Sequence, residues 1–144
     1  MIDDREQRAY AVTWLIRRLF RGMAATANQY LAEAGLTAAH RAVMEFLYPD
    51  TELSVPDIAR RYDVSRQHVQ VTVNALLAKG LLRSIENPQH RRSRLIRLSA
   101  AGRNRFDEIR RDEASVIARV FDEVPDDALE TTHETLSMLL NKLS

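Results

Sequence analysis

Arginine, glutamine and asparagine side chains recur at helical spacing within residues 66–79 of this 144-residue chain. If Val69, Val73 and Leu76 face inward, a helix over this segment presents a mainly polar face outward. The residues on that face are Arg66, Gln67, Gln70, Val71 and Asn74. In the major groove of DNA, arginine pairs with guanine, glutamine and asparagine pair with adenine, and an apolar side chain contacts the thymine methyl. The segment therefore predicts a helix that reads DNA bases.

Three further arginines lie in and beside a polar turn. Residues 81–86 and 93–98 are predicted as two strands, and residues 87–92 form the turn between them. Arg91 and Arg92 stand at the tip of this hairpin, and Arg94 follows closely. Because arginines on a narrow projection suit the minor groove, the hairpin is predicted to contact DNA beside the helix.

Charge is strongly segregated along the chain, although the net charge is only +1. Residues 60–111 hold thirteen Lys and Arg and four Asp and Glu, a net charge of +9. Residues 1–59 carry −2 and residues 112–144 carry −6. A basic middle between acidic ends is typical of a segment that binds a polyanion. Charge alone also fits a solvated charged face, so the residue pattern has to distinguish that face from a polyanion-binding segment.

Helix caps and apolar periodicity predict the elements that hold these residues. The predicted helices are residues 5–34, 38–48, 55–62, 66–79 and 100–122, and a last helix starting at a capping box of Asp127 and Glu130. The predicted caps of the internal helices are Thr37, Ser54, Ser65 and Ser99. Residues 50–53 are predicted as a turn, and Gly102 is interpreted as a junction between elements.

Residues 54–99 therefore follow the order helix, tight turn, helix, strand, turn, strand. This order is typical of a winged helix-turn-helix. The predicted fold class is mainly α, with a small two-stranded β-hairpin wing and long helices at both ends of the chain. The tight turn falls at Asp63 and Val64.

The two terminal helices carry more apolar surface than one chain of this length covers. The stripe of the first helix is Val12, Ile16, Leu19, Phe20, Met23, Ala27, Tyr30 and Leu31. The last helix carries Leu129, Leu136, Leu139, Leu140 and Leu143. These surfaces predict a symmetric homodimer. Trp14 falls nearly opposite the first stripe, beside Tyr10, as a second partner surface or as a lone exposed aromatic residue.

Residues 53–102 resemble the MarR (multiple antibiotic resistance regulator) family. The matching parts are VSRQHV at the start of the predicted base-reading helix, LLAKGLLR before the hairpin, NPQHRR at its tip and LSAAG after it. Leu36 and Thr37 also match, and the resemblance extends over essentially the whole chain. It implies one MarR-like domain over residues 1–144, with a DNA-binding lobe at 36–99. Residues 1–34 and 100–144 would then form the dimerisation helices.

The resemblance also implies a function and a set of residues. Family members are homodimeric regulators that bind a palindromic operator, and many are repressors released by a small aromatic or phenolic ligand. The implied recognition-helix residues are Ser65, Arg66, Gln67, His68, Gln70, Val71 and Asn74, and the implied wing residues are Arg91, Arg92 and Arg94. Candidate residues for a ligand pocket are Arg17, Arg18, His40 and Met44, which a solvated helix face explains as well.

The chain departs from the family pattern at three places. Asp63 stands where glycine is usual, and Val71 stands where a basic residue is frequent. The wing has Asn87 and His90 in place of two aspartates. Without those carboxylates the wing is expected to be more positive and less ordered, and the preferred operator is expected to differ.

Several other functions are excluded or disfavoured. The absence of cysteine removes disulfides, thiolate zinc sites and thiol catalysis. The four histidines have no metal-ligand spacing, and no nucleophile elbow or glycine-rich phosphate loop is present, so no metal, cofactor or enzymatic activity is predicted. The first ten residues are unlike a secretory signal and no membrane segment is expected, so the predicted location is the cytoplasm. The alternative function is a winged-helix protein-interaction module without sequence-specific DNA binding, which the +9 segment disfavours.

Overall fold

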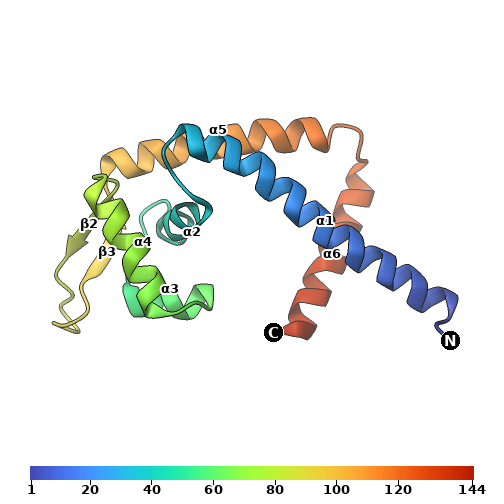
Figure 1. Ribbon diagram of the computed structural model, residues 1–144, viewed down its shortest axis with the longest axis horizontal. Helices are drawn as coiled ribbons and strands as arrows, with labels where there is room; N and C mark the ends of the chain where they lie inside the picture. The colour runs from blue at the N-terminus through green and yellow to red at the C-terminus, as the bar shows by residue number, and fades with distance from the viewer. The chain divides into compact units, whose positions relative to one another are not determined.

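The computed structural model describes residues 1–144. The chain forms two compact units, Met1–Arg110 and Arg111–Ser144. Helices and short strands follow one another along the chain (Figure 1). They are α1 (Asp4–Glu33), α2 (Ala38–Leu47), β1 (Leu53–Ser54), α3 (Val55–Tyr62), α4 (Arg66–Ala78), β2 (Leu82–Ile85), β3 (Leu95–Leu98), α5 (Ala100–Val120) and α6 (Asp126–Leu143). The predicted fold class, mainly helical with a β-hairpin after the helix-turn-helix, is confirmed.

The sheet has three antiparallel strands in the order β1-β3-β2. β2 and β3 form the predicted hairpin, although both strands are shorter than the sequence predicts. β1 adds a third strand by pairing Leu53 with Ile96, in a segment predicted as a turn. Two residues are too few to show the alternation by which a strand is recognised, and their partner lies far along the chain. The expected two-stranded sheet is therefore corrected to three strands.

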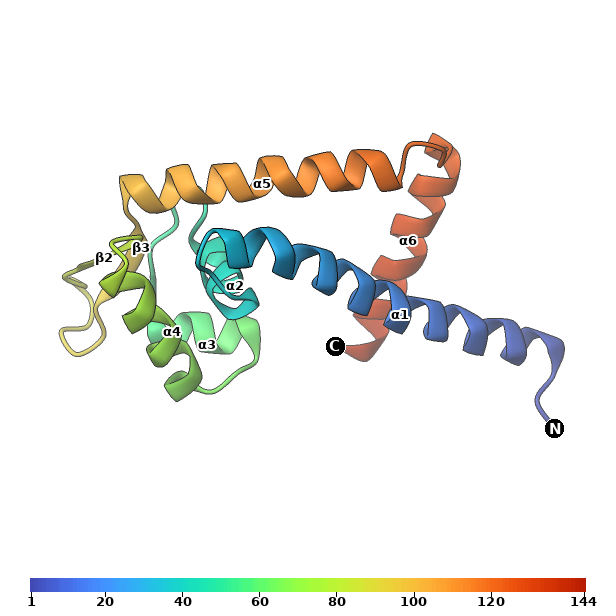
Figure 2. The same cartoon turned by 45° about the horizontal axis from the view of Figure 1, so that its top comes forward.

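The core of the first unit lies where α2, α3, α4 and the start of α5 meet the sheet. Figure 2 shows α2, α3 and α4 from a second side. Ile58 of α3 and Val69 and Val73 of α4 are fully buried in it, as their spacing predicts. The other fully buried side chains are Phe106, Leu31, Met44, Leu47, Leu76 and Val43. Burying one side chain of this kind stabilises the fold by about 1.5–3 kcal/mol.

The predicted caps of the internal helices are present. The hydroxyl oxygens of Thr37, Ser54 and Ser65 accept hydrogen bonds from the backbone N–H three residues later, at 3.1 to 3.3 Å. The capping box predicted from Asp127 and Glu130 is wrong. α6 begins at Asp126, two residues before the start that a cap at Asp127 requires, and its N-cap is Pro125 without a side-chain hydrogen bond. Asp127 therefore lies inside the first turn, where a carboxylate still interacts favourably with the helix dipole.

The start of α5 is fixed tightly to the turn between α4 and β2. The Ser99 hydroxyl donates to the Gly80 carbonyl at 2.6 Å and accepts from the Gly102 N–H at 3.0 Å. Gly102 is not the junction that the sequence suggested, because it lies inside the first turn of α5. A Cβ at this position would lie 1.9 Å from the Leu81 carbonyl oxygen. Close approach of α5 to the Leu81 backbone, just before β2, explains the glycine.

The long helix α1 has a mostly exposed surface within this chain. Leu31 is its only buried residue, whereas Phe20 is 74% exposed and Trp14 is 53% exposed. In the second unit, α6 has no buried residue at all. Apolar side chains of the two predicted stripes, such as Leu19, Met23 and Leu140, are thus exposed to solvent in one chain. No helix is long and apolar enough to cross a membrane.

Candidate nucleic-acid interface

The position of α4 is set by the tight turn that precedes it. α3 ends at Asp63, which has the left-handed conformation with φ 57° and ψ 46°. Aspartate tolerates this conformation better than most residues, so the turn forms without the glycine usual in the resembling family. The Val64 N–H then donates to the Ala59 carbonyl at 3.1 Å. Ser65 caps the next helix, and α4 begins at Arg66.

One face of α4 packs on the core, and the opposite face is open to solvent. Val69, Val73 and Leu76 are fully buried. The exposed residues at the cap and along the outer face are Ser65, Arg66, Gln67, His68, Gln70, Val71 and Asn74. All seven recognition-helix candidates are therefore accessible to a partner. Gln70 Nε2 also donates to Asn74 Oδ1 at 2.8 Å, a contact that the four-residue spacing permits.

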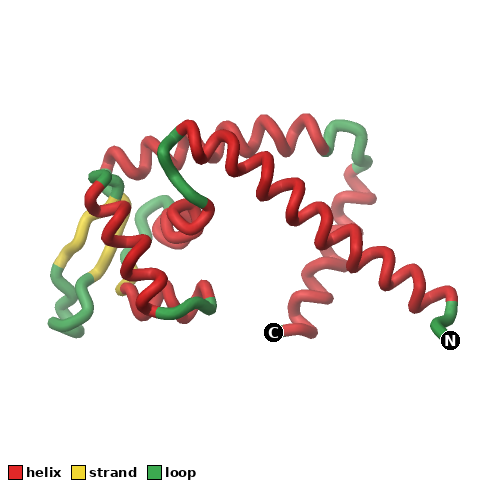
Figure 3. Tube along the Cα trace, viewed as in Figure 1, coloured by secondary structure: helices red, strands yellow, loops and turns green.

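The β2–β3 loop is held by its own backbone and by Asn87. Asn87 Oδ1 accepts from the Gln89 N–H at 3.0 Å, and the Asn87 carbonyl accepts from the His90 N–H at 3.2 Å. This is the local bonding by which Asn or Asp closes a turn. Asn87 thus supplies the oxygen acceptor that an aspartate would supply there. Figure 3 shows the loop projecting beyond the two strands of the hairpin.

The three wing arginines differ in their side-chain contacts. Arg91 and Arg92 are exposed in the loop. Arg94 is tied to the neighbouring strand, because its Nε donates to Ser84 Oγ at 2.6 Å and its Nη2 donates to the Ser84 carbonyl at 3.2 Å. Arg94 therefore lies at the base of the wing in a fixed orientation, whereas Arg91 and Arg92 are the arginines of the tip.

A hollow of about 440 Å³ separates α4 from the wing. Its polar lining includes Arg66, Gln67, Gln70, Arg92 and Arg94. No acidic residue lines it. The hollow therefore presents three guanidinium groups and two side-chain amides, which are donors suited to phosphate oxygens and base edges.

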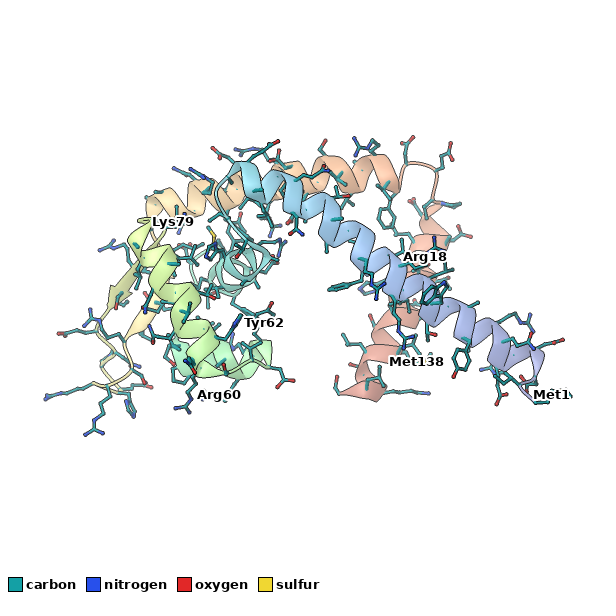
Figure 4. The ribbon with its side chains drawn as sticks, viewed as in Figure 1. Met1, Arg18, Arg60, Tyr62, Lys79 and Met138 are labelled. Carbon is teal, nitrogen blue, oxygen red and sulfur yellow. The ribbon has the colours of Figure 1, made fainter.

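The four ligand-pocket candidates are not gathered at one place in the chain. Arg17 and Arg18 are exposed on α1 (Arg18 is labelled in Figure 4), about 20 Å along the helix axis from the buried Leu31. Met44 is fully buried in the core. His40 Nδ1 accepts from the Thr37 N–H at 3.1 Å, so it serves as a helix cap. Burial and the nearby Lys79 ammonium lower the pKa of His40.

No sequence pattern signals the polar network that ties the lobe to α5. Arg97 pairs with Glu52 at 3.3 Å, and Arg103 pairs with Asp50. Tyr48 donates to Asp107 Oδ1 at 2.7 Å, and this hydrogen bond raises the pKa of the Tyr48 hydroxyl. These partners lie far apart in the sequence, so no local spacing signals them.

Comparison with known proteins matches this geometry. Residues 34–93 match the sequence model of the MarR family. The crystal structure of a MarR family transcription regulator is similar over 95% of this chain and 91% of its own, with a TM-score of 0.87 and 23% identity. The chain has the MarR-family fold. The transcriptional regulator BldR from Sulfolobus solfataricus is also similar, with a TM-score of 0.81 and 20% identity over 98% of this chain and 99% of that one.

Two further proteins are similar to this chain. A mutant MarR from E. coli, solved in complex with operator DNA, is similar over 96% of this chain and 99% of its own, with a TM-score of 0.78 and 17% identity. An uncharacterized protein from Mycobacterium tuberculosis is 37% identical over 91 residues, which are 63% of this chain. The chain spans 64% of the length of that relative.

Proposed function

We propose that this chain is a transcriptional regulator that binds double-stranded DNA sequence-specifically as a homodimer. One observation carries the proposal: Arg66, Gln67 and Gln70 of α4 border the same hollow as Arg92 and Arg94 of the wing, and no acidic residue lines it. A protein-interaction module has no need for this concentration of guanidinium groups beside amide side chains. The operator complex of the similar E. coli MarR supports the same use of the fold.

The exposed residues divide into two roles. The first turns of α4 enter the major groove, where Arg66, Gln67 and Gln70 face the base edges. The N-terminus of α4 suits a backbone phosphate. Arg91 and Arg92 bind the backbone or the minor groove beside the wing. Base contacts then specify the sequence, and the wing positions the protein on the duplex.

The apolar surfaces of α1 and α6 support a dimer. Phe20 and Leu19 on α1, and Leu140 and Leu143 on α6, are each at least 60% exposed in the single chain. Exposed apolar surface of this extent marks an interaction site. A twofold dimer presents two copies of α4 to successive major grooves, about 34–36 Å or a multiple apart, and so favours a palindromic operator.

Repression and its release by a small aromatic ligand complete the proposal. A ligand acts only through a difference in its affinity for two arrangements of the protein. Arg17 and Arg18 are exposed cations suited to an aromatic carboxylate, but they lie well apart from His40 and Met44 along one chain. A pocket containing all four would need the second copy to complete it. Titrating a bound operator with salicylate-like compounds tests this part.

DNA binding is tested by fluorescence anisotropy with labelled duplexes at several salt concentrations. Wild-type protein should bind with an affinity that falls steeply with salt. Arg92→Ala should weaken binding to all duplexes alike and reduce the salt slope by about one unit. Arg119→Ala removes an exposed arginine outside α4 and the wing, and it should behave as wild type. Salt-independent binding, or none, would favour the protein-interaction module instead.

A further inference from the structure

The hydrogen bond between Gln70 and Asn74 has little to contribute to the stability of the fold. Both side chains are exposed on the outer face of α4, and Gln70 Nε2 donates to Asn74 Oδ1 at 2.8 Å. Exposed pairs at this spacing stabilise an isolated helix by only about 0.2–0.5 kcal/mol. The bond does restrict the Gln70 amide, because an amide anchored through its nitrogen does not exchange the positions of nitrogen and oxygen.

The anchored amide has a defined set of remaining groups. A glutamine amide carries two N–H donors and one carbonyl acceptor. With one N–H engaged by Asn74, Gln70 keeps one donor and one acceptor. Adenine offers the N7 acceptor and the N6 donor in the major groove. The remaining N–H of Gln70 can donate to N7, and its carbonyl oxygen can accept from N6. Guanine offers two acceptors, N7 and O6, which require two donors.

The surroundings of Gln70 place this amide where a duplex edge would lie. Gln70 borders the hollow together with Arg66 and Gln67 from the preceding turn. Asn74 lies one turn further from the N-terminus of α4, on the same exposed face. Gln70 is thus closer to the end of the helix that enters the groove, and Asn74 supports it from behind.

We propose that Asn74 is a positioning residue, which fixes the Gln70 amide so that α4 selects adenine over guanine in the operator. This inference rests on the proposed function, because it requires α4 in the major groove. Asn74 acts through Gln70 and has no need to touch a base itself. The adenine preference therefore depends on the acceptor oxygen at position 74, not on the side-chain amide nitrogen.

Selection from random-sequence duplexes tests the proposal, with wild type, Gln70→Ala, Asn74→Ala and Asn74→Asp. We expect one position in each half-site where wild type prefers adenine over guanine by roughly tenfold, a factor that corresponds to about 1.4 kcal/mol. Gln70→Ala should lose the preference, and Asn74→Ala should reduce it several-fold. Asn74→Asp should keep it, because a carboxylate oxygen still accepts from Gln70 Nε2. The readout is the ratio of affinities, since the added charge weakens binding to every duplex.

The double variant Gln70→Ala/Asn74→Ala separates positioning from direct contact. It should bind the selected duplexes as Gln70→Ala does, with unchanged thermal melting in all variants because the mutated side chains are exposed. Full adenine preference in Asn74→Ala would overturn the inference but leave the proposed function standing. A further loss of affinity when Asn74→Ala is added to Gln70→Ala would also overturn the inference and leave the proposed function standing. Absence of any salt-dependent duplex binding by wild type would overturn both.

Discussion

At the scale of single residues, His40 shows how a side chain chosen for a pocket serves the fold instead. The ring Nδ1 of His40 accepts a hydrogen bond from the Thr37 backbone N–H. The backbone N–H of His40 donates to the Thr37 hydroxyl at 3.2 Å, which completes a capping box at the start of α2. A protonated imidazole has no acceptor nitrogen. Burial, and then the Lys79 ammonium, lower the pKa of His40 from its ordinary value of 6.5. The folded protein thus favours the neutral ring.

The consequence is a loss of stability in mild acid. Because the folded-state pKa is lowered, the unfolded chain binds more protons below pH 6.5, and stability falls as the pH drops from there through the folded-state pKa. His40→Gln keeps a capping acceptor but does not titrate, so its stability should change less between pH 7.5 and pH 5.5. Urea unfolding at both values measures this, with His133→Gln on exposed α6 as the control. Equal pH dependence in wild type and His40→Gln would contradict the assignment.

At the scale of elements, the starts of α2, α3 and α4 could be predicted from sequence because their signals are local. Thr37, Ser54 and Ser65 each lie at a fixed distance from the N–H they accept. β1 could not be predicted, since Leu53 and Ser54 become a strand only by pairing with β3. Gly102 was misinterpreted for the same reason. A glycine is needed at position 102 because the turn into β2 brings the Leu81 backbone beside it.

Replacing Gly102 tests this packing between elements. Gly102→Ala places a Cβ against the Leu81 carbonyl, so α5 has to shift away from the turn before β2. We expect a loss of about 1–3 kcal/mol in the free energy of unfolding, the usual cost of overpacking. Gly22→Ala is the matched control, because a Cβ there meets nothing within 4 Å. It should be neutral or stabilise α1 by up to about 1 kcal/mol. Equal effects of the two substitutions in urea unfolding would refute the packing role.

At the scale of the whole molecule, the sequence predicted which residues are exposed, but it did not predict the surface features that these residues form together. The exposed face of α4 follows from a single helical period. The hollow between α4 and the wing, and the ties of Arg94 to Ser84, require the hairpin to be placed beside the helix. The apolar stripe of α1 was also correct as a pattern. Its residues from Val12 to Met23 are exposed in the single chain, which is the basis of the proposed dimer.

The proposed dimer is tested by placing a charge in its interface. Phe20 on the apolar stripe of α1 is 74% exposed, and Phe20→Lys places a charge in the proposed interface, where an unpaired charge is strongly unfavourable. Ala25→Lys adds the same charge to the opposite face of α1 and serves as the control. Sedimentation at micromolar concentration should give wild type and Ala25→Lys twice the chain mass of 16.5 kDa, and should shift Phe20→Lys toward 16.5 kDa. Because two linked recognition helices bind far more tightly than one, Phe20→Lys should also lose most operator affinity. A monomeric wild type would remove the basis for a palindromic operator.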